Sequence, residues 1–276
     1  LFGGLYSGFA YDTGDPDIIN KALLWIPIGS DSDGKRYTGT FNGNGHTITA
    51  MLAQGTENQG LFGTLGDNAA IKKTSISDSQ IEVTGYGAGG IAGYVNGTGV
   101  AVTECGNEGN LKVSGMSIGG CVGSVSSTGE LVLDGCYNGE RGTISVSRGG
   151  IAGGILGMTD AGTAAGCVTI RNCMNRGKVE GSIASAGIVG VVESGSTTVT
   201  GCYNAGVVSA TMSGGAAGSI TIDGSMSGVA DTDITDCLID ENHNYGGCGN
   251  GLVVKSEAFG TWGAARWLNG DSFKQS

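Results

Sequence analysis

Short runs of alternating apolar and polar residues recur along this chain, and glycine-rich segments separate them. The 3.6-residue spacing of a helix is confined to residues 18–25 and 256–268. The rest of the pattern predicts many short β-strands bounded by turns. No single run is long enough to bury a core, so we expect neighbouring runs to pack on one another.

One glycine-flanked motif returns at a nearly constant interval. It consists of one or two glycines, an apolar residue, a small or apolar residue and a closing glycine. Successive copies lie roughly 30 residues apart, which indicates a structural repeat. The apolar members are Leu61, Ile91, Cys121, Ile151, Ile188, Ala216 and Cys248, and only the step from Ile151 to Ile188 is clearly longer than the rest.

A second series runs in step with the first. It consists of Cys105, Cys136, Cys173, Cys202 and Cys237, and the first four are followed two positions later by Asn107, Asn138, Asn175 and Asn204. Short strands repeated in this way predict an all-β parallel solenoid whose coils stack ~4.8 Å apart. Both series then become columns that point into the core. Strands near residues 81–84, 111–114, 144–147 and 206–209 should share one sheet.

The repeat also predicts the organisation of the chain. We expect one domain of about six coils, each of about 30 residues. Residues 1–60 form an N-terminal cap and first coil, 61–250 the repeat solenoid and 251–276 a C-terminal cap. The open ends of a solenoid expose unpaired strand edges, and tryptophans are placed to cover them. Trp25 is expected at the first end, and Trp262 and Trp267 at the other.

The cysteine columns favour free thiols over disulfides. Stacked residues lie ~4.8 Å apart with parallel side chains, whereas the Cβ atoms of a disulfide approach to ~3.8 Å. One or two bridges remain the alternative, and a zinc site lacks a C-x-x-C pair. Cys167 alone is out of register and should be more exposed. The asparagines are expected to hydrogen-bond to one another and to turn backbone.

Composition and charge exclude several classes of partner. The net charge of −11 and the pI of about 4.5 make the surface acidic, so binding to nucleic acid is not expected. No apolar run approaches the length of a membrane span, so this segment should not insert into a membrane. Glycine supplies 56 of 276 residues and proline two. The chain begins at Leu1 without a charged leader segment, so we expect a processed piece of something longer.

Candidate chemistry is sparse, and no catalytic residue is predicted. His46 and His243 have no partner set that suggests a metal or a catalytic group, and neither H-E-x-x-H nor G-x-S-x-G occurs. No outward column repeats a carboxylate, which argues against a glycosidase. Tyr137, Met174 and Tyr203 share a column that can bind sugar rings or pack at the core edge. One acidic cluster is typical of a solvated loop, with a calcium site as the alternative: Asp231, Asp233, Asp236, Asp240 and Glu241.

The motifs resemble those of the GLUG-repeat proteins. The resemblance rests on the segment from Thr38 to Ile48, on Gly60-Leu61-Phe62-Gly63, and on the repeated Gly-Gly-Ile-x-Gly and Asn-Cys-x-Asn-x-Gly motifs. It covers roughly residues 25–270. It implies a right-handed parallel β-helix in a secreted or cell-surface bacterial protein, such as an adhesin or a region upstream of an IgA1-protease-type peptidase. It implies no catalytic residue.

Two long spacers predict an interaction surface. The spacer from the closing glycine to the next cysteine position is short and nearly constant in most coils, but it is more than half as long again after Gly153 and after Gly218. Loops at 155–166 and 219–233 should therefore flank a notch, defined by Asp160, Glu193, Asp223 and Asp231. Its acidity suits a basic or neutral partner or a bound cation.

We therefore expect a non-catalytic binding or adhesion module on the surface of a bacterium or secreted from it. Its partner would be a host protein, immunoglobulin included, or a glycan. An accessory domain of an IgA1-protease-like peptidase and a β-helix polysaccharide-degrading enzyme are the alternatives.

Overall fold

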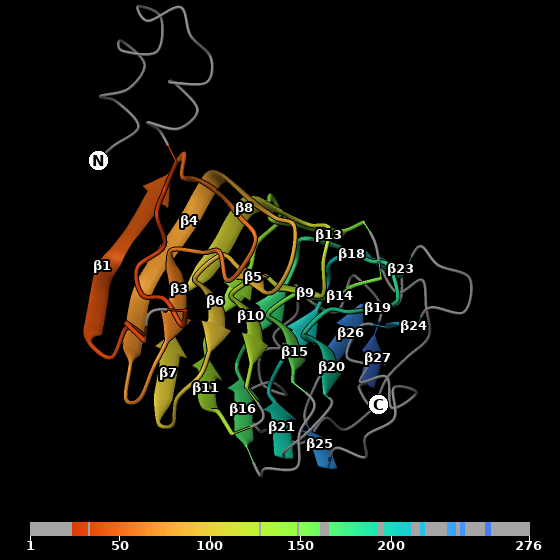
Figure 1. Ribbon diagram of the computed structural model, residues 1–276. Helices are drawn as coiled ribbons and strands as arrows, with labels where there is room; N and C mark the ends of the chain where they lie inside the picture. Colours follow the sequence, from red (N-terminus) through yellow and green to blue (C-terminus); the bar gives the residue numbers. More distant parts are fainter. Residues whose placement is uncertain are drawn as a thin grey trace, which may run out of the picture.

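The chain folds as a stack of parallel β-strands. The computed structural model describes residues 24–32, 34–126, 128–147, 149–160, 166–192 and 196–210, and the backbone of four strands beyond them. In these residues every regular element is a strand, and every ladder is parallel. The strands form a β-solenoid, and five strands in each of its two smaller sheets mark five turns (Figure 1). The prediction of a parallel β-helix is confirmed.

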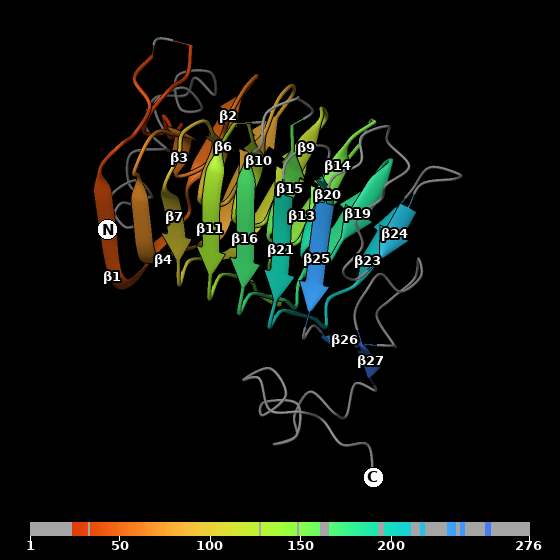
Figure 2. The same cartoon turned by 90° about the horizontal axis from the view of Figure 1, so that it is seen from below.

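The largest wall of the solenoid is a sheet of 17 strands. Its members are β1 (Thr40–Thr49), β2 (Leu52–Gly55), β4 (Ala70–Val83), β7 (Val100–Thr103), β8 (Gly106–Val113), β11 (Glu130–Asp134), β12 (Tyr137–Asn138), β13 (Thr143–Val146), β16 (Cys167–Arg171), β17 (Met174–Asn175), β18 (Lys178–Gly181), β21 (Ser196–Thr200), β22 (Tyr203–Asn204), β23 (Val208–Ala210), β25 (Asp231–Thr235), β26 (Leu238–Asp240) and β27 (Leu252–Val254). Seen from below, β1, β4, β7, β11, β16, β21 and β25 form one row, one strand per turn (Figure 2). The four predicted strands fall in β4, β8, β13 and β23 of this same sheet, as expected.

Two five-stranded sheets complete each turn. One contains β3 (Phe62–Leu65), β6 (Ala92–Val95), β10 (Val122–Val125), β15 (Leu156–Thr159) and β20 (Val189–Val192). The other contains β5 (Ala88–Gly89), β9 (Ser117–Gly119), β14 (Ile151–Gly153), β19 (Ala184–Ala186) and β24 (Ala216–Gly218). The two sheets approach each other closely at their glycines. A Cβ added at Gly123 of β10 would lie 2.7 Å from the Ala88 nitrogen of β5, which leaves no room for a side chain. Close backbone approach therefore explains the closing glycine of the motif.

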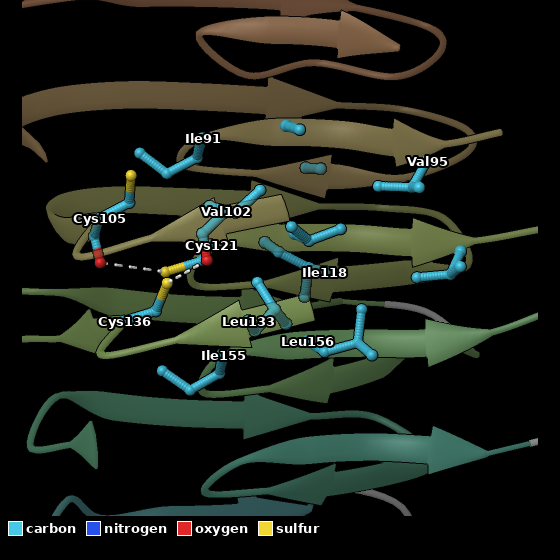
Figure 3. Packing of buried hydrophobic residues seen from close by; sticks show 14 of the residues in the cluster. Ile91, Val95, Val102, Cys105, Ile118, Cys121, Leu133, Cys136, Ile155 and Leu156 are labelled. Atoms are coloured by element: carbon cyan, nitrogen blue, oxygen red, sulfur yellow. Dashed lines mark hydrogen bonds between the residues drawn. The ribbon is translucent and has the colours of Figure 1, made fainter. Parts of the chain in front are cut away.

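Buried aliphatic side chains from all three sheets form one continuous core. Val95, Val102, Ile118 and Leu133 are completely buried, and Figure 3 shows such side chains converging from opposite walls. At the N-terminal end, Trp25 donates a hydrogen bond from its indole nitrogen to the Leu61 carbonyl oxygen at 3.1 Å. Residues 24–37 also form isolated bridges with β2 and β3. Trp25 therefore packs against the core at the N-terminal end of the described solenoid, where the cap is predicted, whereas Trp262 and Trp267 lie outside the described residues.

The structure corrects the predicted apolar column at two positions. Ile151 pairs with Ser117 and Ala184, and Ala184 pairs with Ala216, so Ile151 and Ala216 belong to the sheet of β14. Backbone hydrogen bonds instead continue the column through Leu61, Ile91, Cys121, Ile155 and Ile188. The sequence carries two overlapping glycine motifs between residues 149 and 157, and stacking selects the second one. With Ile155 in the column, the steps from Cys121 and to Ile188 become nearly equal, and the one long step in the predicted series disappears.

The cysteine and asparagine columns form as predicted. Cys105, Cys136, Cys173 and Cys202 are buried free thiols, and Cys167 is exposed. Asn107, Asn138, Asn175 and Asn204 are completely buried and joined in sequence by amide hydrogen bonds of 2.8, 2.7 and 2.6 Å. They also bond to the turn backbone, as at Gly109 and Gly206. Cys237 and Cys248 lie outside the described residues.

Candidate functional site

The structure describes the backbone of only two of the four residues of the predicted notch. Of its four residues, Glu193 and Asp223 lie outside the described residues, and Asp231 begins strand β25, paired with Ser196. The prediction that residues 155–166 and 219–233 are loops is wrong at two places. Residues 156–159 form the buried strand β15, and residues 231–233 belong to β25. The register correction explains the first error, because the long spacer was counted from Gly153 instead of Gly157.

The Asp160 side chain forms a hydrogen bond within the protein. It follows β15 directly, and its Oδ2 atom accepts a hydrogen bond of 2.8 Å from the Tyr94 hydroxyl of β6, two turns earlier. Burial raises the pKa of Asp160, although the Tyr94 hydroxyl opposes this shift by stabilising the carboxylate. Burial and the adjacent carboxylate also raise the pKa of Tyr94. Asp160 therefore has a structural partner in Tyr94, and its role in binding stays a prediction.

The described surface offers a different candidate in the outward column of the short strands β12, β17 and β22. Tyr137 pairs with Gly106 on one side and with Met174 on the other, and Met174 pairs with Tyr203. All three side chains are half-buried, and the Tyr203 hydroxyl donates a hydrogen bond to the Met174 sulfur at 2.8 Å. The predicted stacking of these residues is confirmed. Partial burial raises the pKa of Tyr203.

Two glycines shape a hollow beside this column. The Tyr137 ring lies over Gly106, where an added Cβ would come within 2.0 Å of a ring carbon. The Glu108 carboxylate lies over Gly139 of the next turn, where a Cβ would be 1.8 Å from its Oε1 atom. Because these side chains lean over glycines of the preceding and following turns, a hollow of about 330 Å³ is present, and we call it the Tyr137 hollow. It is lined by Glu108, Tyr137, Gly139, Glu140, Arg141, Met174 and Arg176.

Ion pairs hold the polar side chains of the Tyr137 hollow. The Arg141 backbone nitrogen donates to Glu108 Oε2 at 2.9 Å, and the Arg141 guanidinium lies 3.8 Å from the same carboxylate oxygen. The guanidinium also reaches Asp78, two turns earlier, at 3.4 Å. Arg176, one turn later, pairs with Glu140. Successive turns therefore contribute charged groups to one place.

This arrangement is suited to binding a polar ligand that has an apolar face. An aromatic ring and a thioether supply flat and flexible apolar surface, while carboxylates and guanidiniums supply acceptors and donors at its rim. Ligand sites commonly combine a concave, partly apolar surface with a few placed polar groups.

The Tyr137 hollow was only partly visible in the sequence. The column of Tyr137, Met174 and Tyr203 was recognised, but its charged rim was not. Glu108 and Arg176 occupy one column, on either side of Gly139, but carry opposite charges, and Glu140 and Arg141 lie in the turn after β12. A search for identical residues within one column therefore passes over them. The informative signal was the small residue at the equivalent position of the adjacent turn, Gly106 or Gly139.

Within the described residues, no group of three or more His, Cys, Asp or Glu is placed to hold a metal ion. His46 is exposed on β1, directly after a bulge formed by Asn44 and Gly45 with positive φ. Asp236 and Glu241 of the acidic cluster lie outside the described residues, so a calcium site there stays a prediction. No helix among the described residues has the length and apolar character needed to cross a membrane.

Comparisons with known proteins give two partial matches. The chain is 33% identical over 82 residues to a putative Gly-rich membrane protein of Evansella cellulosilytica, covering 29% of the chain and 9% of that protein. It is 36% identical over 87 residues to halomucin of Haloquadratum walsbyi, covering 30% of the chain and 1% of that protein. The chain therefore spans less than a tenth of the length of each of these relatives. No family model and no solved structure matches it.

Proposed function

We propose that this chain is a non-catalytic, glycan-binding segment of a larger protein at the surface of a bacterium or secreted from it. The observation that carries the proposal is the Tyr137 hollow, where an aromatic ring, two carboxylates and two guanidiniums meet on a rigid solenoid. A pyranose ring presents an apolar C–H face and a rim of hydroxyl groups, which matches this combination.

The contacts of the Tyr137 hollow suit a neutral sugar better than a charged one. Arg141 and Arg176 are both engaged by carboxylates, so an anionic sugar would have to displace those ion pairs. Hydroxyl groups can instead donate to Glu108 and Glu140 and accept from the arginines while the pairs persist. Glu108, Tyr137 and Met174 project from stacked strands, and ion pairs hold the two arginines, so these groups are partly ordered before a ligand binds.

The surface location rests on the kind of protein that the chain resembles. One partial relative is described as a membrane protein and the other as a halomucin, and both are far longer than this chain. The motif resemblance to the GLUG-repeat proteins favours the same setting. A solenoid is suited to a long surface protein because its turns are equivalent and the chain lengthens by adding further turns.

Glycan-array screening followed by calorimetry tests this proposal. We expect a neutral oligosaccharide to bind, and Tyr137→Ala to weaken its affinity at least tenfold because the stacking face is removed. Tyr86→Ala is the matched control, since Tyr86 is an exposed tyrosine that does not line the Tyr137 hollow. Equal loss in both variants, or no bound glycan at all, would overturn the assignment of the hollow.

The same pair of proteins, wild type and Tyr137→Ala, also tests for a host-protein ligand, immunoglobulin included. A serum protein captured equally by wild type and by Tyr137→Ala would place the interaction elsewhere on the solenoid. A downstream H-E-x-x-H motif in the full-length sequence would favour the accessory domain of an IgA1-protease-like peptidase.

A polysaccharide-degrading enzyme remains a second candidate because Glu108 and Glu140 line one hollow. Glycosidases use two carboxyl groups across the scissile bond. Release of reducing ends from a neutral polysaccharide by the wild type, and its loss in both Glu108→Gln and Glu140→Gln, would favour this candidate.

A further inference from the structure

One turn of the solenoid differs from the others at a core position. Among the described turns, the apolar column carries leucine or isoleucine at Leu61, Ile91, Ile155 and Ile188, and cysteine at Cys121 alone. Cys121 and Cys136 follow one another within the same turn, on either side of β10 and β11. Both are completely buried, so two thiols meet where the other described turns bring an aliphatic side chain to the cysteine column.

The two thiols are in direct contact. They are hydrogen-bonded to each other, and Figure 3 shows their sulfur atoms side by side in the core. The Cys121 thiol also points toward two backbone carbonyl oxygens near Cys136. One belongs to Tyr137, the next residue in sequence, at 3.6 Å, and the other to Cys105, the equivalent residue of the preceding turn, at 3.7 Å. Cys121 therefore projects straight at the cysteine column.

Cys136 also forms a side-chain hydrogen bond with Cys173 of the next turn, so contact alone does not single out Cys121. The direction of approach distinguishes the two pairs. Cys105, Cys136 and Cys173 occupy equivalent positions of successive turns, with parallel side chains and the ~4.8 Å rise between them. A disulfide requires converging Cα–Cβ bonds and a Cβ separation of ~3.8 Å. Side chains that approach from two different walls of the solenoid, as those of Cys121 and Cys136 do, can converge in this way.

We propose that Cys121 and Cys136 are a disulfide-forming pair that oxidises outside the reducing environment of the cell. Both S–H bonds break and one S–S bond forms. Two electrons and two protons pass to a low-molecular-weight disulfide, which is reduced to two thiols. Because both thiols are buried, the exchange takes place during folding or local opening. The product closes a single turn on itself, and the rest of the thiol column remains reduced.

Peptide mapping without reduction tests the pairing. The protein is refolded in a mixture of reduced and oxidised glutathione, free thiols are alkylated in denaturant, and the chain is cut after Glu130, which separates the two cysteines. We expect a peptide pair joined through Cys121 and Cys136. Complete alkylation of both, or linkage of Cys136 to Cys105 or Cys173, would overturn the proposal.

Melting curves with and without reductant supply an independent readout. A bridge that closes a loop of this size should raise the apparent melting temperature by about 5 °C relative to the reduced protein. Cys121→Ile is the matched control, because it restores the aliphatic residue found at this position in other turns. It should fold and lose the dependence on reductant. A wild type that melts at the same temperature in both states would contradict a bridge that constrains the turn.

Discussion

The side-chain amide of Asn107 donates a hydrogen bond to the amide oxygen of Asn138 at 2.8 Å, and both residues are completely buried. Asn138 in turn donates to Asn175 at 2.7 Å, so the Asn138 amide is both an acceptor and a donor within one ladder. A ladder of this kind ties successive turns together at the position where the chain bends between β12 and β13.

Replacing Asn138 with leucine should break this ladder at its centre. The Asn107 amide and the Asn175 oxygen would both lose a partner inside the core, which should lower the free energy of unfolding by about 2–4 kcal/mol. Urea unfolding followed by circular dichroism measures the change. The half-buried Asn110, which accepts a hydrogen bond from Thr143, provides a control. Asn110→Ala should lower the free energy of unfolding by less than about 1 kcal/mol. An equal loss in the two variants would show that the ladder stabilises the protein no more than an ordinary hydrogen bond does.

A second prediction checks the corrected register. Leu156 is completely buried in β15, within a segment that the repeat pattern alone assigned to a loop. Leu156→Ala should therefore destabilise the protein by about 2–5 kcal/mol through lost burial and a new cavity. Ile26→Ala, at a side chain that is 84% exposed, should change stability by less than about 0.5 kcal/mol. If Leu156→Ala lowers the free energy of unfolding as little as Ile26→Ala does, residues 155–159 form a loop and not a buried strand.

The third prediction concerns pH and Asp160. Burial raises its pKa in the folded state above the usual 3.8, so the unfolded chain ionises first as the pH rises. Its contribution to stability is fully present below pH 3.8 and is lost as the pH rises through the higher, folded-state value. Asp160→Asn keeps an acceptor for Tyr94 and cannot ionise. It should match the wild type at pH 3 and exceed its stability at pH 7.

Unfolding titrations in urea from pH 3 to 8 measure this difference. Tyr94→Phe serves as the companion variant, because losing the hydroxyl removes a group that stabilises the carboxylate. Its stability should fall more steeply than that of the wild type over the same range. A pH-independent gap between Asp160→Asn and the wild type would disprove the assigned cause.

The fourth prediction separates exposed from buried thiols. Cys167 is exposed, whereas burial raises the pKa of Cys105 to about 12 and leaves almost no thiolate at neutral pH. N-ethylmaleimide at pH 7.5 should therefore modify Cys167 within minutes and Cys105 only as fast as the protein opens. Peptide mass spectrometry at timed intervals distinguishes the sites. Rapid modification of Cys105 in the native protein would show that the column is open to solvent.

The sequence by itself determined the repeat, the parallel stacking and the contents of both ladders. When equivalent residues recur at equal intervals, stacking places cysteine on cysteine and asparagine on asparagine, whatever the details of each turn. The same logic identified Cys167 as out of register and therefore exposed. These features depend on local pattern alone.

Only the tertiary structure decided between the two overlapping glycine motifs at residues 149–157, because both satisfy the local pattern and only the second lets Leu156 stack on Val122. It also decided where the charged groups of the Tyr137 hollow meet. Asp78, Glu108, Arg141 and Arg176 lie on four different turns, and Glu108 reaches Arg141 of the next turn by leaning over Gly139. A periodic pattern describes what repeats, whereas a binding surface is built from positions where successive turns differ.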